Sequence, residues 1–257
     1  FHMNAPIAAD FLTPPRLFDN FGRCITYLRL SITDRCNLRC RYCMPESGVS
    51  FLSHEEILSY EELGRLSRIF VTLGVTKIRL TGGEPFVRKN CLEFIAGLKN
   101  SFPGLDLRIT TNGVALRPHI EALKKLGIEG VNLSLDTLDH QKFMQITRRD
   151  KLDQVLAAFS EALAFGIPLK INTVVREDAS DEELLQMAGV AERYPVDLRF
   201  IETMPFSGKK CSHTVPAVSV EKRLRDILPD LRECASLEIA TSKKFSIKGF
   251  RGTIGLI

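Results

Sequence analysis

The sequence predicts an α/β fold: a partial (β/α)6 barrel with a short C-terminal β extension. Two observations support this prediction. Runs of β-branched and aliphatic residues alternate with runs of helical period along most of the chain, which indicates repeated strand–helix–strand units. Within each strand candidate, polar and apolar residues also alternate, so every strand presents one polar and one apolar face. Consecutive parallel strands joined by helices wind right-handed, and six such units form a curved sheet wrapped by helices.

Six segments have the composition and length of strands. They are YLRLSIT from Tyr27, VTKIRLT from Val75, DLRITTN from Asp106, GVNLSLD from Gly130, PLKINTV from Pro168 and VDLRFIET from Val196. Alternation in the last segment, KFSIKGFRGTIGLI, predicts the β extension.

Three helices are predicted between the strands from their start and stop signals. They are a helix opened by a capping box at Ser59 and Glu62 and ended at Gly74, a helix from Leu152 to before Gly166, and a helix opened by a capping box at Ser180 and Glu183.

Length and composition limit the classes of protein to which this chain could belong. The chain has 257 residues, of which 44% are hydrophobic, and a formal net charge of +4. This length suits one barrel domain, and the charge is too mild to indicate a nucleic-acid partner. No apolar run approaches membrane-spanning length, and the N-terminus lacks the pattern of a secretory signal. We expect a cytoplasmic protein without a membrane partner, or one of the mitochondrial matrix if the source is eukaryotic.

The expected organisation has three parts. Residues 1–22 form an N-terminal extension, in which Phe1 and His2 are expected to be a tag remnant before a native Met3. Residues 23–206 form the barrel, and residues 207–257 form the C-terminal extension. The alternating segment at the end of the chain stops at Ile257 without a turn or cap, which predicts that the extension is truncated.

Polar residues of the strands share one face. Helices need the apolar face, so the polar set is expected to line the barrel interior. The set comprises Arg29, Ser31, Thr33, Lys77, Arg79, Thr81, Arg108, Thr110, Asn112, Asn132, Ser134, Asp136 and Lys170, with Arg199 as a further candidate. Several cations in one interior predict an anionic ligand, because each desolvated charge costs several kcal/mol unless it is paired. Carboxylates inside the barrel that neutralise the cations remain the alternative.

Three of the seven cysteines crowd into CNLRCRYC, in the loop after the first strand. The carboxyl ends of barrel strands carry the functional loops. Zinc is one candidate for Cys36, Cys40 and Cys43, although structural zinc normally takes four ligands and no fourth lies nearby. A four-iron cluster normally takes four thiolates, so three would leave one iron open to a substrate or cofactor. Asp34 and Arg35 are expected to support this loop, and Cys24, Cys91, Cys211 and Cys234 are expected to be isolated thiols.

The spacing of the three cysteines, with the aromatic Tyr42 before the last one, resembles the radical S-adenosylmethionine (SAM) superfamily. GGEP at Gly82–Pro85 is similar to the motif that binds the methionine amino group of SAM in that family. The resemblance implies one [4Fe–4S] cluster on the three cysteines, with SAM chelating the open iron. It also implies SAM contacts by Gly82, Gly83 and Glu84, and a 5′-deoxyadenosyl radical that abstracts hydrogen from the substrate.

Six motifs together are similar to the GTP 3′,8-cyclase family, over roughly residues 12–257. They are LRLSITDRCNLRCRYCMPE, KIRLTGGEPFVR, ITTNG, LSLDTLD, KINTVV and FIETMP. The resemblance implies conversion of GTP to (8S)-3′,8-cyclo-7,8-dihydroguanosine 5′-triphosphate, the first step of molybdenum cofactor biosynthesis. It implies GTP contacts by Arg29, Arg79, Thr110 and Lys170, and a SAM pocket lined by Tyr42, Gly83, Ser134 and Met204. On spacing alone, Met204 could equally be a core methionine and Ser134 a plain interior polar residue.

The same resemblance implies partners: an electron donor such as flavodoxin or ferredoxin and a downstream cyclic pyranopterin monophosphate synthase, with a second copy of the chain as a further candidate. In the family, a segment beyond GFRGTIGLI carries a second three-cysteine cluster that binds the GTP base. This chain stops at Ile257, so we expect SAM cleavage with impaired cyclisation. Two alternatives stay open: another radical SAM enzyme acting on a different anionic substrate, and a non-catalytic iron–sulfur or zinc-binding module.

Overall fold

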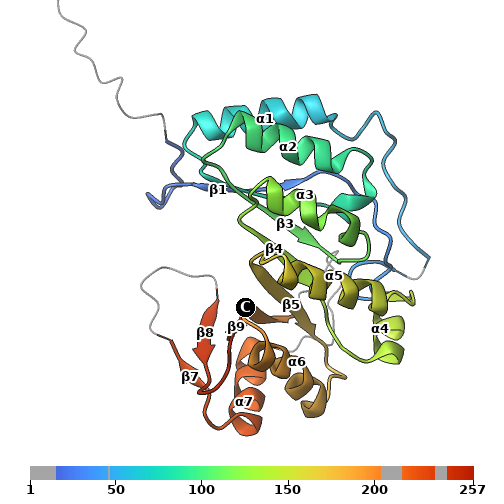
Figure 1. The fold of residues 1–257 in the computed structure, drawn as a ribbon, viewed down its shortest axis with the longest axis vertical. Helices are drawn as coiled ribbons and strands as arrows, with labels where there is room; N and C mark the ends of the chain where they lie inside the picture. Colours follow the sequence, from blue (N-terminus) through green and yellow to red (C-terminus); the bar gives the residue numbers. More distant parts are fainter. Residues whose placement is uncertain (1–15, 46, 204–215, 235–241) are drawn as a thin grey trace, which may run out of the picture.

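A nine-stranded open sheet organises the fold (Figure 1). The computed structural model describes residues 16–45, 47–203, 216–234 and 242–257. The strands are β1 (Tyr27–Ser31), β2 (Lys77–Thr81), β3 (Asp106–Thr111), β4 (Gly130–Ser134), β5 (Leu169–Val175), β6 (Asp197–Glu202), β7 (Arg232–Glu233), β8 (Lys243–Ser246) and β9 (Thr253–Leu256). Their order is β1-β2-β3-β4-β5-β6-β9-β8-β7, and the first six are parallel neighbours. The predicted partial barrel is therefore confirmed.

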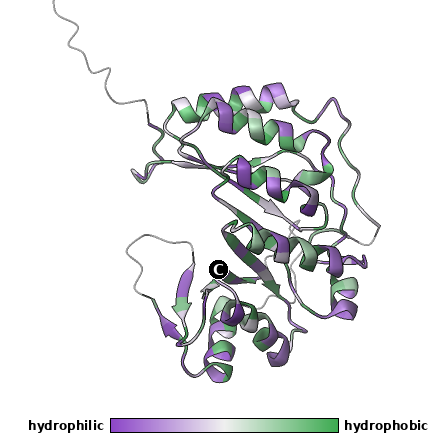
Figure 2. Ribbon diagram, in the orientation of Figure 1, coloured by the Kyte–Doolittle hydropathy of each residue, from purple (hydrophilic) through white to green (hydrophobic). Residues whose placement is uncertain are grey.

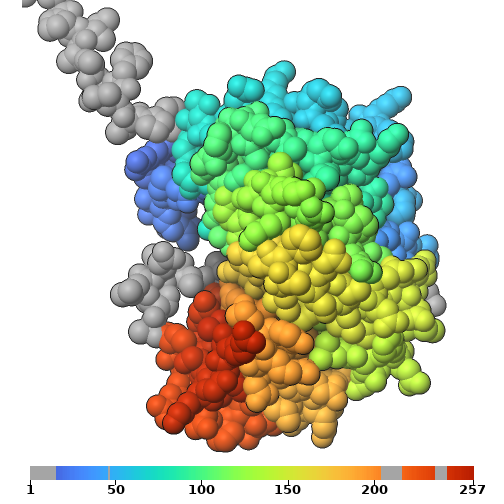
Figure 3. All heavy atoms as spheres, viewed as in Figure 1, coloured from blue at the N-terminus to red at the C-terminus, as the bar shows by residue number. Residues whose placement is uncertain are grey.

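Within the described residues, seven α-helices connect the strands and lie across one face of the sheet (Figure 1). They are α1 (Tyr60–Thr72), α2 (Cys91–Ser101), α3 (Ile120–Lys125), α4 (His140–Thr147), α5 (Leu152–Ala164), α6 (Asp181–Arg193) and α7 (Ala217–Ile227). Short 3₁₀ turns span Pro85–Val87 and Arg117–His119. Both predicted capping boxes are present, and Gly74 follows α1 with φ +93°. Figure 3 shows that the helices cover this face in chain order, from cyan at one end to orange at the other.

Helices α2, α3, α4 and α7 go beyond the predicted set. Helix α2 begins after Asn90, which has a left-handed conformation and caps no backbone N–H with its side chain. Pro216 precedes α7 and likewise makes no side-chain cap. Such helices give no clear start signal in the sequence, because packing against the sheet rather than capping defines where they begin.

The alternation of the strand faces is confirmed. In β3, Leu107 and Ile109 are fully buried against the helices, while Arg108 and Thr110 are half-buried on the opposite face. The helices show hydrophilic and hydrophobic residues in alternation (Figure 2), as amphipathic helices on a core do. The polar face of the strands, which we call the lumen, is thus partly open to solvent rather than packed with aliphatic side chains.

The C-terminal extension continues the sheet. Strand β9 pairs in parallel with β6, and β8 pairs antiparallel with β9, which confirms the predicted β extension. The expected boundary at residue 206 lies outside the described residues, so the division into 1–22, 23–206 and 207–257 stays a prediction. No helix in the described ranges combines the length and apolar character needed to cross a membrane.

Candidate active site

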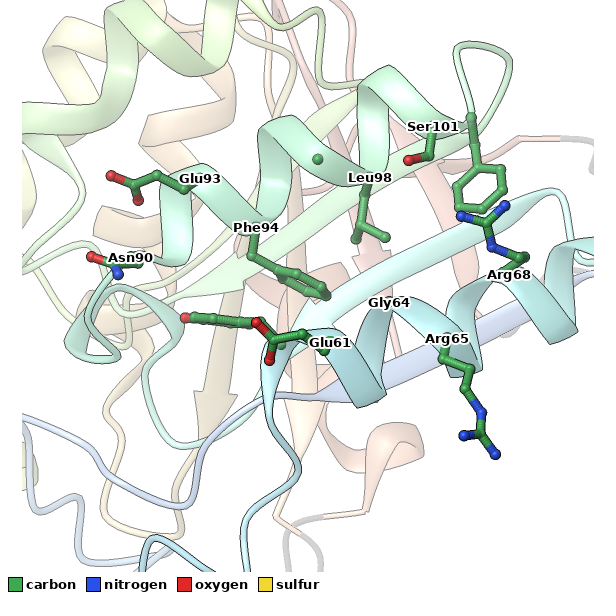
Figure 4. A pocket seen from close by; sticks show the side chains of 12 residues that line it. Glu61, Gly64, Arg65, Arg68, Asn90, Glu93, Phe94, Leu98 and Ser101 are labelled. Atoms are coloured by element: carbon green, nitrogen blue, oxygen red, sulfur yellow. The ribbon is translucent and has the colours of Figure 1, made fainter.

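A cavity of about 270 Å³ lies at the carboxyl ends of β1 to β6 and brings the predicted site residues together. Its lining includes Arg29, Cys36, Cys40, Tyr42, Cys43, Gly82, Gly83, Thr110, Asn112, Ser134, Asp136 and Asn172. A larger cavity of about 570 Å³ lies between α1 and α2, where Phe94 and Leu98 point toward α1 (Figure 4). None of the three clustered cysteines lines that outer cavity. The candidate active site is therefore the smaller cavity, because the three cysteines line it.

The three cysteines are free thiols around this cavity. Cys36 and Cys40 are half-buried, whereas Cys43 is exposed. Burial raises the pKa of Cys40 to about 12. Cys43 is exposed as a residue, but desolvation of its sulfur raises its pKa to about 11, and the Asp136 carboxylate adds to both shifts. The thiols are therefore protonated in the ligand-free protein at neutral pH, and a bound metal must displace those protons.

The Asn112 side chain orients the first cysteine of the loop. Among the described residues, no group of three His, Cys, Asp or Glu side chains is placed to hold a metal ion. The Asn112 amide lies 3.6 Å from the Cys36 sulfur and 2.7 Å from the Asn37 side-chain oxygen, which fixes the first cysteine against β3.

Asp136 fixes Tyr42 at the rim of the cavity. The Tyr42 hydroxyl donates a hydrogen bond of 2.7 Å to Asp136 Oδ2, and the Val174 N–H donates one of 2.9 Å to Oδ1. Burial raises the pKa of Asp136, while these two hydrogen bonds oppose the shift. The predicted set lacks Asp136 as a site residue. Its position in LSLDTLD, two residues after Ser134 at the end of β4, is the signal that could have found it.

Gly82 and Gly83 join β2 to the cysteine loop. The Gly83 N–H donates to the Thr33 carbonyl at 2.7 Å, and the next N–H, of Glu84, donates to the Arg35 carbonyl at 2.8 Å. A Cβ at Gly83 would overlap the Arg35 carbonyl oxygen, and one at Gly82 would overlap that of Thr33. Both glycines line the cavity, which fits the predicted contact with SAM. The close approach that requires glycine at 83, however, is to protein backbone.

Glu84 lies beneath the cavity rather than on its lining. It is 1% exposed. Its Oε1 accepts hydrogen bonds from the Thr111 hydroxyl at 2.7 Å and the Phe86 N–H at 3.2 Å, and its Oε2 accepts one from the Asn112 N–H at 2.6 Å. Burial raises the pKa of Glu84, and these donors oppose the shift. With both oxygens occupied, the carboxylate ties the β2 loop to the end of β3; direct contact with SAM stays a prediction.

One buried polar atom of a residue that lines the cavity has no hydrogen-bond partner in the described structure. Asn172 Oδ1 is buried and makes no hydrogen bond. Ser134, its cross-strand neighbour in register, lines the same cavity. An unpaired buried carbonyl oxygen costs about 1–3 kcal/mol, so the site is built for a ligand that donates a hydrogen bond there. Met204 lies outside the described residues.

The lumen cations are only partly neutralised. Two aspartates pair with four of them: Asp106 with Arg108 at 2.7 Å and Lys77 at 3.3 Å, and Asp197 with Arg199 at 2.9 Å and Lys170 at 3.3 Å. Each aspartate thus faces two cations. The alternative prediction, that carboxylates inside the barrel pair with the cations, is correct for these four side chains. Each aspartate neutralises only one of its two cations, so positive charge remains in the lumen.

Arg29 and Arg79 form no ion pair within the described residues. They are cross-strand neighbours, and Arg79 also neighbours Arg108 in the next strand. Burial lowers the pKa of Arg79, the nearby Tyr27 opposes this, and Arg199, Arg108 and Arg29 lower it further. Its Nε is buried without a hydrogen-bond partner. Like-charged neighbours with unpaired donors are the arrangement expected of a site for an anion.

Three of the four predicted substrate residues lie on two cavities. Arg29 and Thr110 line the cavity of about 270 Å³, and Lys170 lines one of about 320 Å³ near the amino ends of the strands. Asn132 also lines the second cavity; its Nδ2 is buried and unpaired. Thr110, Asn132 and Lys170 are consecutive cross-strand neighbours, so the two cavities share one continuous row of polar side chains. Arg79 lines neither cavity but lies beside Arg29 in the same sheet.

Known proteins resemble this chain in sequence and in fold. Residues 30–191 match the model of the radical SAM superfamily. Molybdenum cofactor biosynthesis protein 1 of Drosophila melanogaster is 43% identical over 245 residues, covering 94% of this chain and 43% of that protein. GTP 3′,8-cyclase of Moorella thermoacetica is 42% identical over 244 residues, covering 93% of this chain and 75% of that protein. The structure of Streptococcus suis SuiB bound to S-adenosylmethionine superposes with a TM-score of 0.64 at 18% identity, covering 79% of this chain and 46% of SuiB.

The chain spans about two fifths of the length of the animal relatives that it matches. The activities named for those whole proteins are therefore only proposed for this chain. The superfamily match nevertheless covers more than half of the chain, and three quarters of the bacterial relative is matched at 42% identity. The chain belongs to the radical SAM superfamily and, within it, to the GTP 3′,8-cyclase family.

Proposed function

We propose that this chain cleaves SAM in the cavity of about 270 Å³ and forms the radical-generating part of a GTP 3′,8-cyclase. The observation that carries the proposal is the convergence of the three cysteines, Tyr42, Gly83 and Ser134 on one cavity that also holds an unpaired Asn172 oxygen. The residues fit a [4Fe–4S] cluster with SAM. When bound, the cluster supplies the electron that splits the sulfonium of SAM and yields a 5′-deoxyadenosyl radical.

The residues of this chain hold and orient the two cofactors. Cys36, Cys40 and Cys43 would bind the cluster, and the Asn112 amide steadies the first of these sulfurs. Asn172 Oδ1 would accept a hydrogen bond from SAM, because it is the buried acceptor on the cavity that lacks a donor. Ser134 beside it would add a second polar contact.

Three further residues complete the proposed SAM pocket. Tyr42, whose hydroxyl is held by Asp136, lines the cavity and would contact SAM there. Gly83 lines the cavity without a side chain to fill it. Met204 joins the pocket on the family resemblance alone.

Reduction with dithionite tests this activity directly. After anaerobic reconstitution, the chain is expected to convert SAM to methionine and 5′-deoxyadenosine, measured by liquid chromatography. Cys40→Ala should abolish 5′-deoxyadenosine formation, because a cluster ligand is lost. Cys91→Ala is the matched control: this thiol is buried in α2 and does not line the cavity. Equal product from Cys40→Ala and the unchanged chain would refute the assignment.

We propose GTP as the substrate, with its triphosphate along the lumen. Arg29 and Arg79 lack carboxylate partners in the described residues, and a triphosphate would supply the missing negative charge. Thr110, Asn132 and Lys170 continue the polar row toward the second cavity. Asn132 Nδ2 is a buried donor without an acceptor, and a phosphate or ribose oxygen would satisfy it.

Arg79→Gln is expected to weaken GTP binding by about 10- to 100-fold, because a charge-assisted hydrogen bond contributes about 1.5–3 kcal/mol. Calorimetric titration at several salt concentrations measures this, and the variant should also show a weaker salt dependence. The same change should raise the melting temperature of the ligand-free protein, since Arg79 is half-buried among like charges. Arg65→Gln, on the exposed face of α1, should change neither quantity. Weaker binding together with lower stability would indicate a structural role instead.

The remaining assignments follow from the family. We propose that the product is (8S)-3′,8-cyclo-7,8-dihydroguanosine 5′-triphosphate and that a cyclic pyranopterin monophosphate synthase consumes it. We propose a flavodoxin or ferredoxin as electron donor, no nucleic-acid or membrane partner, and a homodimer as the assembly. For location, we propose the cytoplasm, or the mitochondrial matrix in a eukaryotic source; a relative from Arabidopsis thaliana is named as mitochondrial.

A further inference from the structure

Five arginines surround the cysteine loop. Arg35, Arg39 and Arg41 belong to the loop itself, and Arg148 and Arg149 follow α4; we call these five residues the arginine patch. The loop and α4 lie side by side (Figure 1), because the N–H groups of Arg39 and Arg41 donate to the carbonyls of Thr147 and Ile146 at 2.9 Å each. The backbones that carry the five arginines therefore adjoin next to the three cysteines; Arg41 and Arg149 are exposed, and the other three are half-buried.

The positive charge of the patch is not neutralised within the described residues. The guanidinium groups of Arg39, Arg148 and Arg149 donate to backbone carbonyls, at distances from 2.5 to 3.2 Å. Those of Arg35 and Arg39 lie over the Phe51 ring, at 5.7 and 5.5 Å from its centroid. No carboxylate described in the structure forms an ion pair with any of the five arginines. Other arginines in the structure do have such partners, namely Arg23, Arg108, Arg117, Arg176, Arg199, Arg223 and Arg225.

The patch also resembles an interface in its apolar content. Met144 on α4 is 56% exposed, and Leu52 is 48% exposed. Both lie on segments bound to the patch or its loop: the Arg148 N–H donates to the Met144 carbonyl, and the Leu52 N–H donates to Asp34. Exposed apolar side chains rimmed by arginine are typical of protein-binding surfaces. Cys43 is itself exposed, so a cluster held there would reach this surface.

We propose that the arginine patch is the docking surface for an acidic one-electron donor protein. The inference rests on the proposed function, in which the cluster takes one electron from outside the chain for each SAM cleaved. The donor loses that electron and the cluster gains it, with no atom transferred. A donor with an acidic surface around its flavin or iron–sulfur centre would be steered to the cysteine loop by complementary charge.

The inner members of the patch have a competing role that the experiment must separate from docking. Arg39 and Arg148 bind carbonyls of the cysteine loop itself, so their charges could offset the negative charge of the thiolates. Arg41 and Arg149 are exposed, so substitutions at these two residues distinguish docking of a donor from support of the cluster. The Arg41 side chain makes no hydrogen bond or ion pair within the described residues, and the Arg149 guanidinium donates only to the neighbouring Arg148 carbonyl. Reversing their charges should affect docking while leaving the cluster in place.

The experiment measures cluster reduction by a photoreduced acidic flavodoxin in anaerobic stopped flow, from the loss of cluster absorbance. The double variant Arg41→Glu/Arg149→Glu is expected to lower the second-order rate constant about tenfold at low ionic strength. At about 1 M salt, where the Debye length falls to about 3 Å, the difference should disappear. The neutral pair Arg41→Gln/Arg149→Gln should give a smaller decrease of the same kind.

A charge-matched control makes the result specific. Arg65→Glu/Lys222→Glu changes the net charge equally on α1 and α7, at exposed residues outside the patch, and should keep the original rate constant. Equal rate constants for the two double-Glu variants would overturn the proposal. So would loss of iron from the patch variant, because the arginines would then serve the cluster rather than a donor.

A final arm separates this proposal from the proposed function. The yield of 5′-deoxyadenosine after prolonged excess dithionite needs no docking, so all variants should match the unchanged chain. Failure of every protein in this arm would refute SAM cleavage, whereas the absorbance measurement would still decide whether the patch docks the donor.

Discussion

Gly83→Ala is expected to lose most of the iron bound by the reconstituted protein and to lower its melting temperature. The added Cβ would overlap the Arg35 carbonyl carbon and oxygen and crowd the Asp34 carbonyl oxygen. These are backbone atoms of the cysteine loop, so the loop must shift, and forced overpacking costs about 1–3 kcal/mol. Two hydrogen bonds beside Gly83, to the Thr33 and Arg35 carbonyls, would be distorted at the same time. Iron analysis and thermal unfolding measure the two effects.

Gly97→Ala is the matched control. Gly97 lies within α2, and a Cβ there would meet no atom within 4 Å. Alanine inside a helix is favoured over glycine by about 0.5–1 kcal/mol, so this variant should keep its iron and melt at the same temperature or slightly higher. If Gly83→Ala bound SAM poorly but kept full iron and stability, the close contact would be with SAM rather than with the loop.

Glu84→Ala is expected to lower the free energy of unfolding by about 3 kcal/mol or more. The substitution leaves the Thr111 hydroxyl and the Asn112 N–H buried without their acceptor, at about 1–3 kcal/mol for each group, and it opens a cavity as well. For a domain of this size, each kcal/mol corresponds to about 2–4 °C in melting temperature. Denaturant unfolding of the ligand-free protein is the measurement, because it reports the structural role without the cofactors.

Two further variants sharpen this test. Glu84→Gln keeps the shape but has one acceptor oxygen instead of two, so it should fall between alanine and the unchanged chain. Glu93→Ala removes an exposed carboxylate from α2 and should change stability by less than about 0.5 kcal/mol. A Glu84→Ala variant with unchanged stability but weakened SAM binding would contradict the structural role and show that this carboxylate contacts SAM directly.

Much of the fold could be predicted because strand and capping patterns are local. The alternation around Arg108 and Thr110 identified the lumen face, and the capping boxes at Ser59 and Ser180 located two helices. The site could be predicted as far as spacing and motif allow. Cys36, Cys40 and Cys43 do share one cavity, because a short loop at the end of one strand cannot spread its thiols far apart.

The rest depends on tertiary contacts that no local pattern contains. The sequence places Asp106 and Asp197 in strands, but only the sheet register shows that each faces two lumen cations. The bond from Tyr42 to Asp136 joins residues 94 positions apart. Gly83 looked like a ligand contact in the motif, whereas its limiting contact is the Arg35 backbone two elements earlier. In each case the partner is set by packing between strand ends.

The most direct test of the central claim is the stoichiometry of the metal centre and its response to SAM. After anaerobic reconstitution, the chain should contain about four iron and four sulfide ions, and Cys36→Ala, Cys40→Ala and Cys43→Ala should each lose the cluster absorbance. Addition of SAM to the dithionite-reduced protein should change its electron paramagnetic resonance spectrum, because the iron without a thiolate is open to SAM. Zinc without sulfide, or a four-iron cluster whose spectrum ignores SAM, would contradict the account.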